Sequence, residues 1–177
     1  MKRLIYLTIS LFVAFAFASC NDDTVDEAWK DTNEEAYNAI KADTAYKDVR
    51  SFFHPEDGTG PLGVYFKELK KGDGTEHPLQ TSDIKVLYFG KYYNGTYFDA
   101  GTKNNNVPVT FSVGSTVRGF AFALQNMVVG DRWEIVVPYY LGYGTAGSYN
   151  ATTGQTEIPG YTTLFFEIEL VSITTYP

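Results

Sequence analysis

Val86-Leu87-Tyr88-Phe89-Gly90 closes a stretch in which Ile84, Val86 and Tyr88 place a hydrophobic side chain at every second position. Such alternation puts these side chains on one face of a β-strand. Two later stretches, Trp133 to Val137 and Leu164 to Leu170, repeat the pattern. We therefore predict half-buried antiparallel strands at all three places.

Turn signals and a single helical stretch accompany these strands. Gly72-Asp73-Gly74 is a turn signal, and Asn94-Gly95 is placed to close a tight hairpin. Phe120 to Met127 has helical spacing, and Gly130 just beyond it is a stop signal. One short helix against a curved antiparallel sheet defines an α+β fold class.

The start of the chain has the pattern of an export signal. Met1-Lys2-Arg3 is basic, and the stretch from Leu4 to Ala18 carries no charge. This apolar stretch is shorter than the ~20 residues that span a bilayer. We therefore predict a signal peptide over residues 1–19.

Cys20 is the only cysteine of the chain, which excludes a disulfide within it. Phe17-Ala18-Ser19-Cys20 resembles a bacterial lipobox, in which the cysteine is acylated after cleavage, although Phe17 replaces the usual aliphatic residue. The alternative is a free thiol without a role. The lipobox predicts a lipid on Cys20 that anchors the protein in the bacterial cell envelope, at the outer membrane, and leaves open the periplasmic or the surface face.

Residues 20–60 are predicted to form an acidic helical arm and a hinge. Thr24 and Glu27 are spaced like a capping box, and helical periodicity runs to about Arg50. The apolar stripe is narrow, which favours an arm that packs on its own domain or acts as a tether over a dimerising coil. The turn-rich stretch from His54 to Pro61 ends the helix, so we place a domain boundary near residue 60 and a second unit over residues 61–177.

Composition excludes several classes of function. The formal net charge is -7, and no cluster of Lys and Arg is present, so no nucleic-acid partner is expected. His54 and His77 are the only histidines, and each precedes a proline, so no metal site is expected; nor is a cofactor. The stretch from Thr145 to Gln155 is rich in Gly, Ser, Thr and Asn, and we expect a long mobile loop there.

Five short segments stand in a fixed order along the chain: Val86-Leu87-Tyr88-Phe89-Gly90, Phe98-Asp99, Val117-Arg118-Gly119-Phe120, Tyr143-Gly144 and Leu164-Phe165-Phe166. Together they resemble the FKBP-type peptidyl-prolyl cis/trans isomerases, the tacrolimus-binding immunophilins. The likeness covers about Gly63 to Ile173 and implies a five- or six-stranded antiparallel sheet wrapped around the short helix, with a pocket between them.

The resemblance also implies which residues form the pocket. Asp99 and Tyr143 match its two polar groups, and the backbone N–H of Val117 matches the donor to a ligand carbonyl. Aromatic and aliphatic residues match the walls and the floor, where Phe120 stands in place of a common Trp: Tyr88, Phe98, Phe111, Val117, Phe120, Ile158 and Phe166. Of these residues, Phe98, Asp99, Val117, Tyr143 and Phe166 are the candidate catalytic set, and Tyr88, Phe111, Phe120 and Ile158 are expected to bind substrate.

The same residues can also be interpreted as purely structural. The aromatics on alternating strands would be core in any sheet protein, and Asp99 could be a turn residue bonded to its own backbone. Val109 replaces an aromatic wall residue, Gly160 replaces a second Pro, and the loop 145–157 is longer than in compact relatives. These departures bear on substrate preference more than on activity.

The resemblance implies isomerisation of X-Pro bonds in exported or envelope proteins. The expected partners are proline-containing polypeptides, the membrane through Cys20, and a tacrolimus-like macrocycle as an inhibitor to be tested; the oligomeric state is left open. The main alternative is a catalytically weak peptide-binding module or chaperone that uses the same groove. A surface lipoprotein that captures a glycan is a third class, suggested only by aromatics near the loop.

Overall fold

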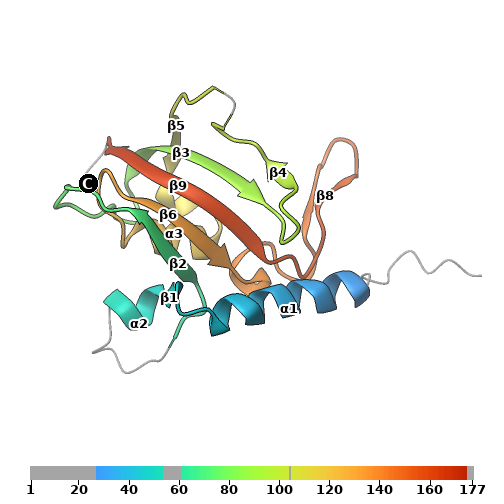
Figure 1. The fold of residues 1–177 in the computed structure, drawn as a ribbon. Coiled ribbons are helices and arrows are strands. Elements are labelled where there is room, and N and C mark those ends of the chain that lie inside the picture. Colours follow the sequence, from blue (N-terminus) through green and yellow to red (C-terminus); the bar gives the residue numbers. More distant parts are fainter. Residues whose placement is uncertain (1–26, 54–60, 104, 175–177) are drawn as a thin grey trace, which may run out of the picture.

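Seven strands form one curved antiparallel sheet in the computed structural model, which describes residues 27–53, 61–103 and 105–174 (Figure 1). The sheet order is β1-β2-β6-β9-β3-β4, and β5 also pairs with β3. In chain order the strands are β1 (Lys47–Asp48), β2 (Tyr65–Lys70), β3 (Asp83–Lys91), β4 (Tyr97–Asp99), β5 (Val109–Ser112), β6 (Arg132–Val137) and β9 (Leu164–Ile173). Five or six strands were expected, so this sheet has one strand more than six. Its strand β1 comes from the arm, residues 20–60.

The short helix α3 (Arg118–Leu124) lies against the inner face of the sheet. Its buried side chains, Phe120, Ala123 and Leu124, meet the alternating residues of the strands, such as Ile84 and Ile168, in one core. The alternation predicted for β3, β6 and β9 is therefore confirmed. The described residues also form the single-turn 3-10 helices η2 (Val113–Ser115), between β5 and α3, and η3 (Tyr139–Leu141), after β6.

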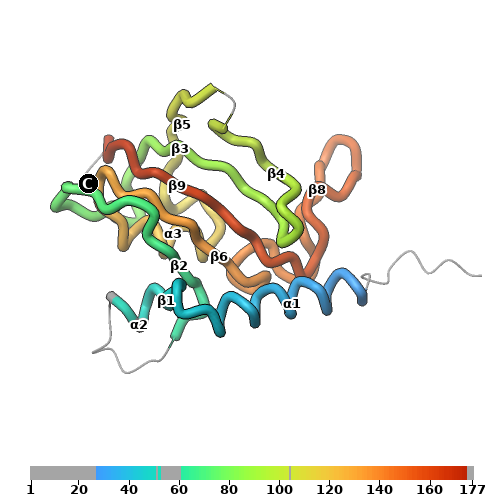
Figure 2. The backbone as a smooth tube through the Cα atoms, viewed as in Figure 1, coloured from blue at the N-terminus to red at the C-terminus, as the bar shows by residue number. Residues whose placement is uncertain are grey.

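The helix α1 (Glu27–Ala42) covers part of the outer face of the same sheet. Figure 2 shows it running along the end of the sheet at which β2 and β9 begin. There Tyr65, Val136 and Phe165 form a second small cluster, and the α1 residues Ala36, Tyr37 and Ile40 are packed against it together with Tyr46 and Tyr93. The central strands are thus buried on both faces near this end.

Polar contacts fix α1 to the chain segment that precedes β9. The buried side chain of Asn33 accepts a hydrogen bond from the Thr163 amide at 2.9 Å, and the Thr163 hydroxyl donates to the Asn33 carbonyl. Trp29 donates its indole N–H to the Thr162 hydroxyl at 3.1 Å. Farther along the arm, Tyr46 donates its hydroxyl to Glu134 of β6. The arm therefore packs on the sheet of its own chain.

The prediction of one helix to about Arg50 is wrong. α1 ends at Ala42, and the carboxylate of Asp43 accepts a hydrogen bond from the Ala45 amide, which turns the chain. β1 then pairs with Tyr65 and Phe66 of β2, and a separate helix α2 (Val49–Phe53) follows. Because β1 precedes residue 60 and pairs beyond it, the proposed domain boundary runs through a single sheet.

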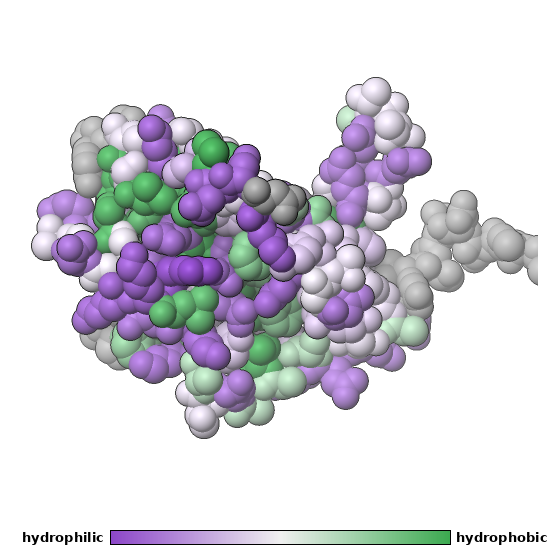
Figure 3. Space-filling model, turned by 45° about the horizontal axis from the view of Figure 1, so that its top comes forward, coloured by the Kyte–Doolittle hydropathy of each residue, from purple (hydrophilic) through white to green (hydrophobic). Residues whose placement is uncertain are grey.

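The expected loop over Thr145–Gln155 contains regular structure. β7 (Ser148–Tyr149) and β8 (Thr156–Ile158) pair as an antiparallel hairpin. The Asn150 side chain closes its tip by accepting hydrogen bonds from the amides of Thr152 and Thr153 at 3.0 and 3.1 Å. Short polar residues thus build a turn here. In the space-filling view the hairpin stands clear of the body of the molecule (Figure 3).

Several sequence predictions lie outside the described residues, namely the signal peptide, Cys20, Thr24 with its capping box, and His54. Across 27–53, 61–103 and 105–174, no helix combines the length and the apolar character needed to cross a membrane.

Candidate active site

A hollow of about 740 Å³ opens between the inner face of the sheet, the start of α3 and the β7–β8 hairpin. All nine residues predicted from the sequence line it: Tyr88, Phe98, Asp99, Phe111, Val117, Phe120, Tyr143, Ile158 and Phe166. Four further residues that the sequence analysis did not select also line it, Ser115, Thr116, Ser148 and Glu157. The topology therefore brings together residues from β3, β4, β5, α3, β8 and β9.

Aromatic rings set edge to face build the floor and the walls. The Phe120 and Phe166 ring centroids are 5.0 Å apart with planes at 81°, and Phe98 meets Phe166 at 5.5 Å and 88°. Tyr88 packs similarly against Phe111 at 5.2 Å. Such pairs contribute about 0.5–1.5 kcal/mol beyond their buried area, so the rings hold one another in place. Phe120 and Phe166 are nearly inaccessible, and therefore serve both the core and the hollow.

Asp99 at the end of β4 is held by two donors. The Tyr88 hydroxyl donates to one carboxylate oxygen at 2.6 Å, and the Gly101 amide donates to the other at 2.8 Å. The second bond is the local contact expected of Asp99 as a turn residue bonded to its own backbone. Burial, followed by the hydrogen bond to Asp99, raises the pKa of Tyr88 far above its ordinary value, so this hydroxyl stays protonated. Asp99 is at once a turn residue and a fixed carboxylate of the hollow.

The Tyr143 hydroxyl and the Val117 amide are hydrogen-bond donors of the lining that have no partner within the described part of the chain. The Tyr143 hydroxyl makes no hydrogen bond there, and its pKa is raised by burial and then by the charges of Asp99 and Glu157, which keeps it a donor. The amide of Val117, in extended backbone just before α3, likewise meets no acceptor among these residues. Both groups are available to a bound carbonyl.

Gly90 is required by the packing of the wall. A Cβ on this residue would lie 2.4 Å from the Phe98 ring and 3.1 Å from the Phe166 ring. Gly90 ends the first of the five segments, but no role was predicted for it from the sequence. A glycine inside an alternating strand was the available signal, because it often marks the close approach of another group.

Side chains that could bind a metal ion are not grouped in the described part of the chain. Among residues 27–53, 61–103 and 105–174, no three His, Cys, Asp or Glu side chains are grouped as a metal ion would need. His77 instead places its Nδ1 3.0 Å from the Met127 carbonyl oxygen.

Residues 74–171 match the family model described as FKBP-type peptidyl-prolyl cis-trans isomerase. The structure defines the class of the protein as an α+β fold with an aromatic pocket between its sheet and a short helix. Because the match spans more than half of the chain, the protein belongs to the FKBP-type peptidyl-prolyl cis-trans isomerase family.

Known proteins of this kind resemble the chain in sequence and in structure. A macrophage infectivity potentiator of Trypanosoma cruzi is 36% identical over 113 residues, which are 64% of this chain and 54% of that protein. A protein of Legionella longbeachae named outer membrane protein MIP is 35% identical over 113 residues, 64% of this chain and 45% of its own length. The chain spans about half the length of the curated relatives it matches.

A solved structure has the same fold over most of its length. The crystal structure of a peptidyl-prolyl cis-trans isomerase from Pseudomonas syringae pv. tomato has a TM-score of 0.67 and 27% sequence identity. The match covers 86% of this chain and 98% of that chain. The overall architecture, arm included, is therefore similar to that of a known isomerase structure.

Proposed function

We propose that the protein is a peptidyl-prolyl cis/trans isomerase that accelerates X-Pro rotation in exported or envelope proteins. The observation that carries the proposal is the hollow itself, an aromatic box in which the Asp99 carboxylate is fixed and the Tyr143 hydroxyl and the Val117 amide are unpaired among the described residues. Membership of the family supports it.

The chemistry of X-Pro rotation suits such a site. Rotation crosses a barrier of roughly 18–20 kcal/mol because the planar amide loses its resonance, and no bond breaks. The carbonyl is less polarised in the twisted state than in the planar one. An apolar hollow that removes water from the amide therefore disfavours the planar ground state more than the twisted state. No nucleophile is needed.

The polar groups would orient the substrate in this box. The Tyr143 hydroxyl or the Val117 amide donates to the carbonyl of the bound segment, while the rings of Phe98 and Phe166 enclose the proline. Asp99 supplies a carboxylate that Tyr88 and Gly101 already hold in place, so it needs no reorganisation when the amide twists.

The proposed place of action is the bacterial cell envelope, with a lipid on Cys20 as the anchor. The basic start, the uncharged stretch and the lipobox-like Phe17-Ala18-Ser19-Cys20 support this assignment. The name of the Legionella longbeachae relative, an outer membrane protein, agrees with it. Labelling of the expressed protein with a fatty acid, lost in Cys20→Ser, tests the anchor.

A proline-limited refolding assay and a peptide isomerisation assay test the activity. The purified protein should accelerate both, and a tacrolimus-like macrocycle should inhibit both if the activity resides in the hollow. Asp99→Ala should lower kcat/KM while unfolding remains cooperative. Binding of proline peptides without any acceleration would instead identify a peptide-binding module or chaperone that uses the same groove.

A further inference from the structure

Glu157 places a carboxylate at the rim of the hollow, where the sequence analysis predicted no functional residue. It belongs to β8, it is exposed, and it is one of the lining residues. Its neighbour Ile158 is 6% exposed and belongs to the core. The carboxylate is therefore attached to a buried anchor at the edge of the hollow.

Contacts on either side hold Glu157 in place. The Tyr92 hydroxyl donates to the Glu157 carbonyl at 3.2 Å, and the Tyr92 ring packs 5.2 Å from the wall residue Phe98. The side-chain amide of Asn150, on the same hairpin, donates to the Glu157 carboxylate at 3.1 Å. The backbone of Glu157 is thus tied to the pocket wall, and its carboxylate is tied to the hairpin.

The lining of the hollow is negatively charged. Among the residues that the structure describes, Asp99 and Glu157 are its only carboxylates, and no Lys, Arg or His lines it. The charges of both carboxylates contribute to the raised pKa of Tyr143, after burial, so both act on the same region. Asp99 already has two donors, whereas Glu157 takes part in none of the ion pairs of the described residues.

We infer that Glu157 selects X-Pro segments in which a Lys or Arg side chain flanks the proline. The aromatic box holds the proline, and a flanking cation lies within reach of the rim carboxylate, which has no cation of its own. This inference rests on the proposed function and names its substrate class. Because an exposed ion pair changes an equilibrium by about two- to fivefold, the preference should have that size.

Two peptide series test the preference, one with Lys, Gln or Glu before the proline and one with the same residues after it. The protein should give a kcat/KM that is about two- to fivefold higher for Lys than for Gln in one of the series, and lowest for Glu. Glu157→Gln keeps the oxygen that accepts from Asn150 and removes only the charge, so it should abolish the preference. Glu76→Gln is the matched control, because Glu76 is exposed and does not line the hollow.

Salt gives an independent readout. The preference for Lys should shrink between about 0.01 M and about 1 M salt, because the interaction is exposed to solvent. Equal kcat/KM for Lys, Gln and Glu in both series would overturn the inference, as would a preference that survives in Glu157→Gln or is lost equally in Glu76→Gln.

Calorimetric binding of the same peptides separates this inference from the proposed function. If no peptide is isomerised but Lys peptides bind more tightly and Glu157→Gln removes the difference, the selectivity stands and the isomerase function falls. If neither turnover nor binding depends on the flanking charge, the selectivity is wrong whatever the activity.

Discussion

Phe166 belongs both to the core between the sheet and α3 and to the wall of the hollow. It is 6% exposed and packs edge to face on both Phe98 and Phe120. We expect Phe166→Ala to lower the free energy of unfolding by about 3 kcal/mol or more, because the ring leaves a cavity. The same change should lower kcat/KM, because two neighbouring rings of the wall lose their support. Urea denaturation and the peptide assay measure the two effects.

Phe165 is the matched control for Phe166. It is the preceding residue of β9 and is 8% exposed, but it lies under α1 on the other face of the sheet. Phe165→Ala should cost a similar amount of stability and leave kcat/KM close to that of the parent under conditions in which the protein is folded. An equal loss of activity in both variants would mean that stability, and not the wall, limits turnover.

Gly90 gives a second residue-scale prediction. The added methyl group of Gly90→Ala would overlap the Phe98 ring, so we expect a loss of about 1–3 kcal/mol and a lower kcat/KM. In a Phe98→Ala background the overlap is gone, and the stability cost of Gly90→Ala should shrink. Additive costs in the double variant would show that the ring is not the obstacle.

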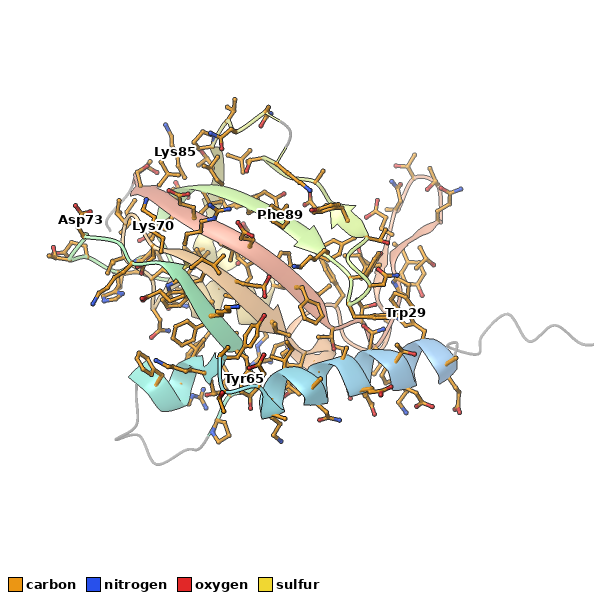
Figure 4. All side chains as sticks on the ribbon, viewed as in Figure 1. Trp29, Tyr65, Lys70, Asp73, Lys85 and Phe89 are labelled. Atoms are coloured by element: carbon orange, nitrogen blue, oxygen red, sulfur yellow. The ribbon has the colours of Figure 1, made fainter. Side chains whose placement is uncertain are left out.

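The arm helix is an element whose contacts converge on the pocket. Trp29, labelled in Figure 4, packs on Tyr92 at 5.4 Å, and Tyr92 in turn contacts Phe98 and the Glu157 carbonyl. The Thr162 hydroxyl, which accepts from Trp29, donates to the Pro159 carbonyl beside Ile158. α1 therefore braces both the β4 side and the hairpin side of the hollow.

Asn33→Ala tests how strongly the arm is held. The substitution leaves the buried Thr163 amide without its acceptor, and an unsatisfied buried donor costs about 1–3 kcal/mol. We expect that loss in urea denaturation. Asn38→Ala on the exposed face of α1 should change stability by less than about 0.5 kcal/mol. Equal effects of the two substitutions would indicate that helix propensity, and not the contact with Thr163, decides the outcome.

The strands and the hollow were predictable from the sequence to different depths. One-face burial of β3, β6 and β9 follows from local alternation, so Ile84 and Ile168 could be placed in the core. Burial of Val136 and Phe165 on the opposite face could not, because it depends on α1, more than 90 residues earlier in the chain. Nothing local in Asn33 or Trp29 indicates a partner near residue 163.

The lining of the hollow was predictable only through the spacing of the five segments. Tyr88, Asp99 and Tyr143 come from separate elements, and no local pattern in the chain indicates that they meet. Glu157 escaped prediction because it lay at the end of the stretch 145–157, which was expected to be a loop. The short strands β7 and β8 have two and three residues, too few for a period-2 signal.

At the scale of the whole molecule, tyrosines that are shielded in part from water link stability to alkaline pH. Burial is the largest cause of a raised pKa at six of them, Tyr37, Tyr46, Tyr65, Tyr88, Tyr92 and Tyr143. Their pKa values in the unfolded chain are near 10. A folded pKa above the unfolded one means that the neutral form is favoured by folding. The stabilisation is therefore complete below pH 10 and is lost as the pH rises above it.

We accordingly expect the free energy of unfolding to fall steeply from about pH 10 to about pH 12, with the tyrosines of the folded protein ionising late and together as it unfolds. Urea denaturation at a series of pH values and the absorbance of tyrosinate measure the two quantities. Tyr88→Phe removes one titrating group without removing the ring, so its stability should fall less steeply above pH 10 than that of the parent. A free energy of unfolding that stays constant through this range, with all fourteen tyrosines ionising near the unfolded pKa, would contradict the expectation.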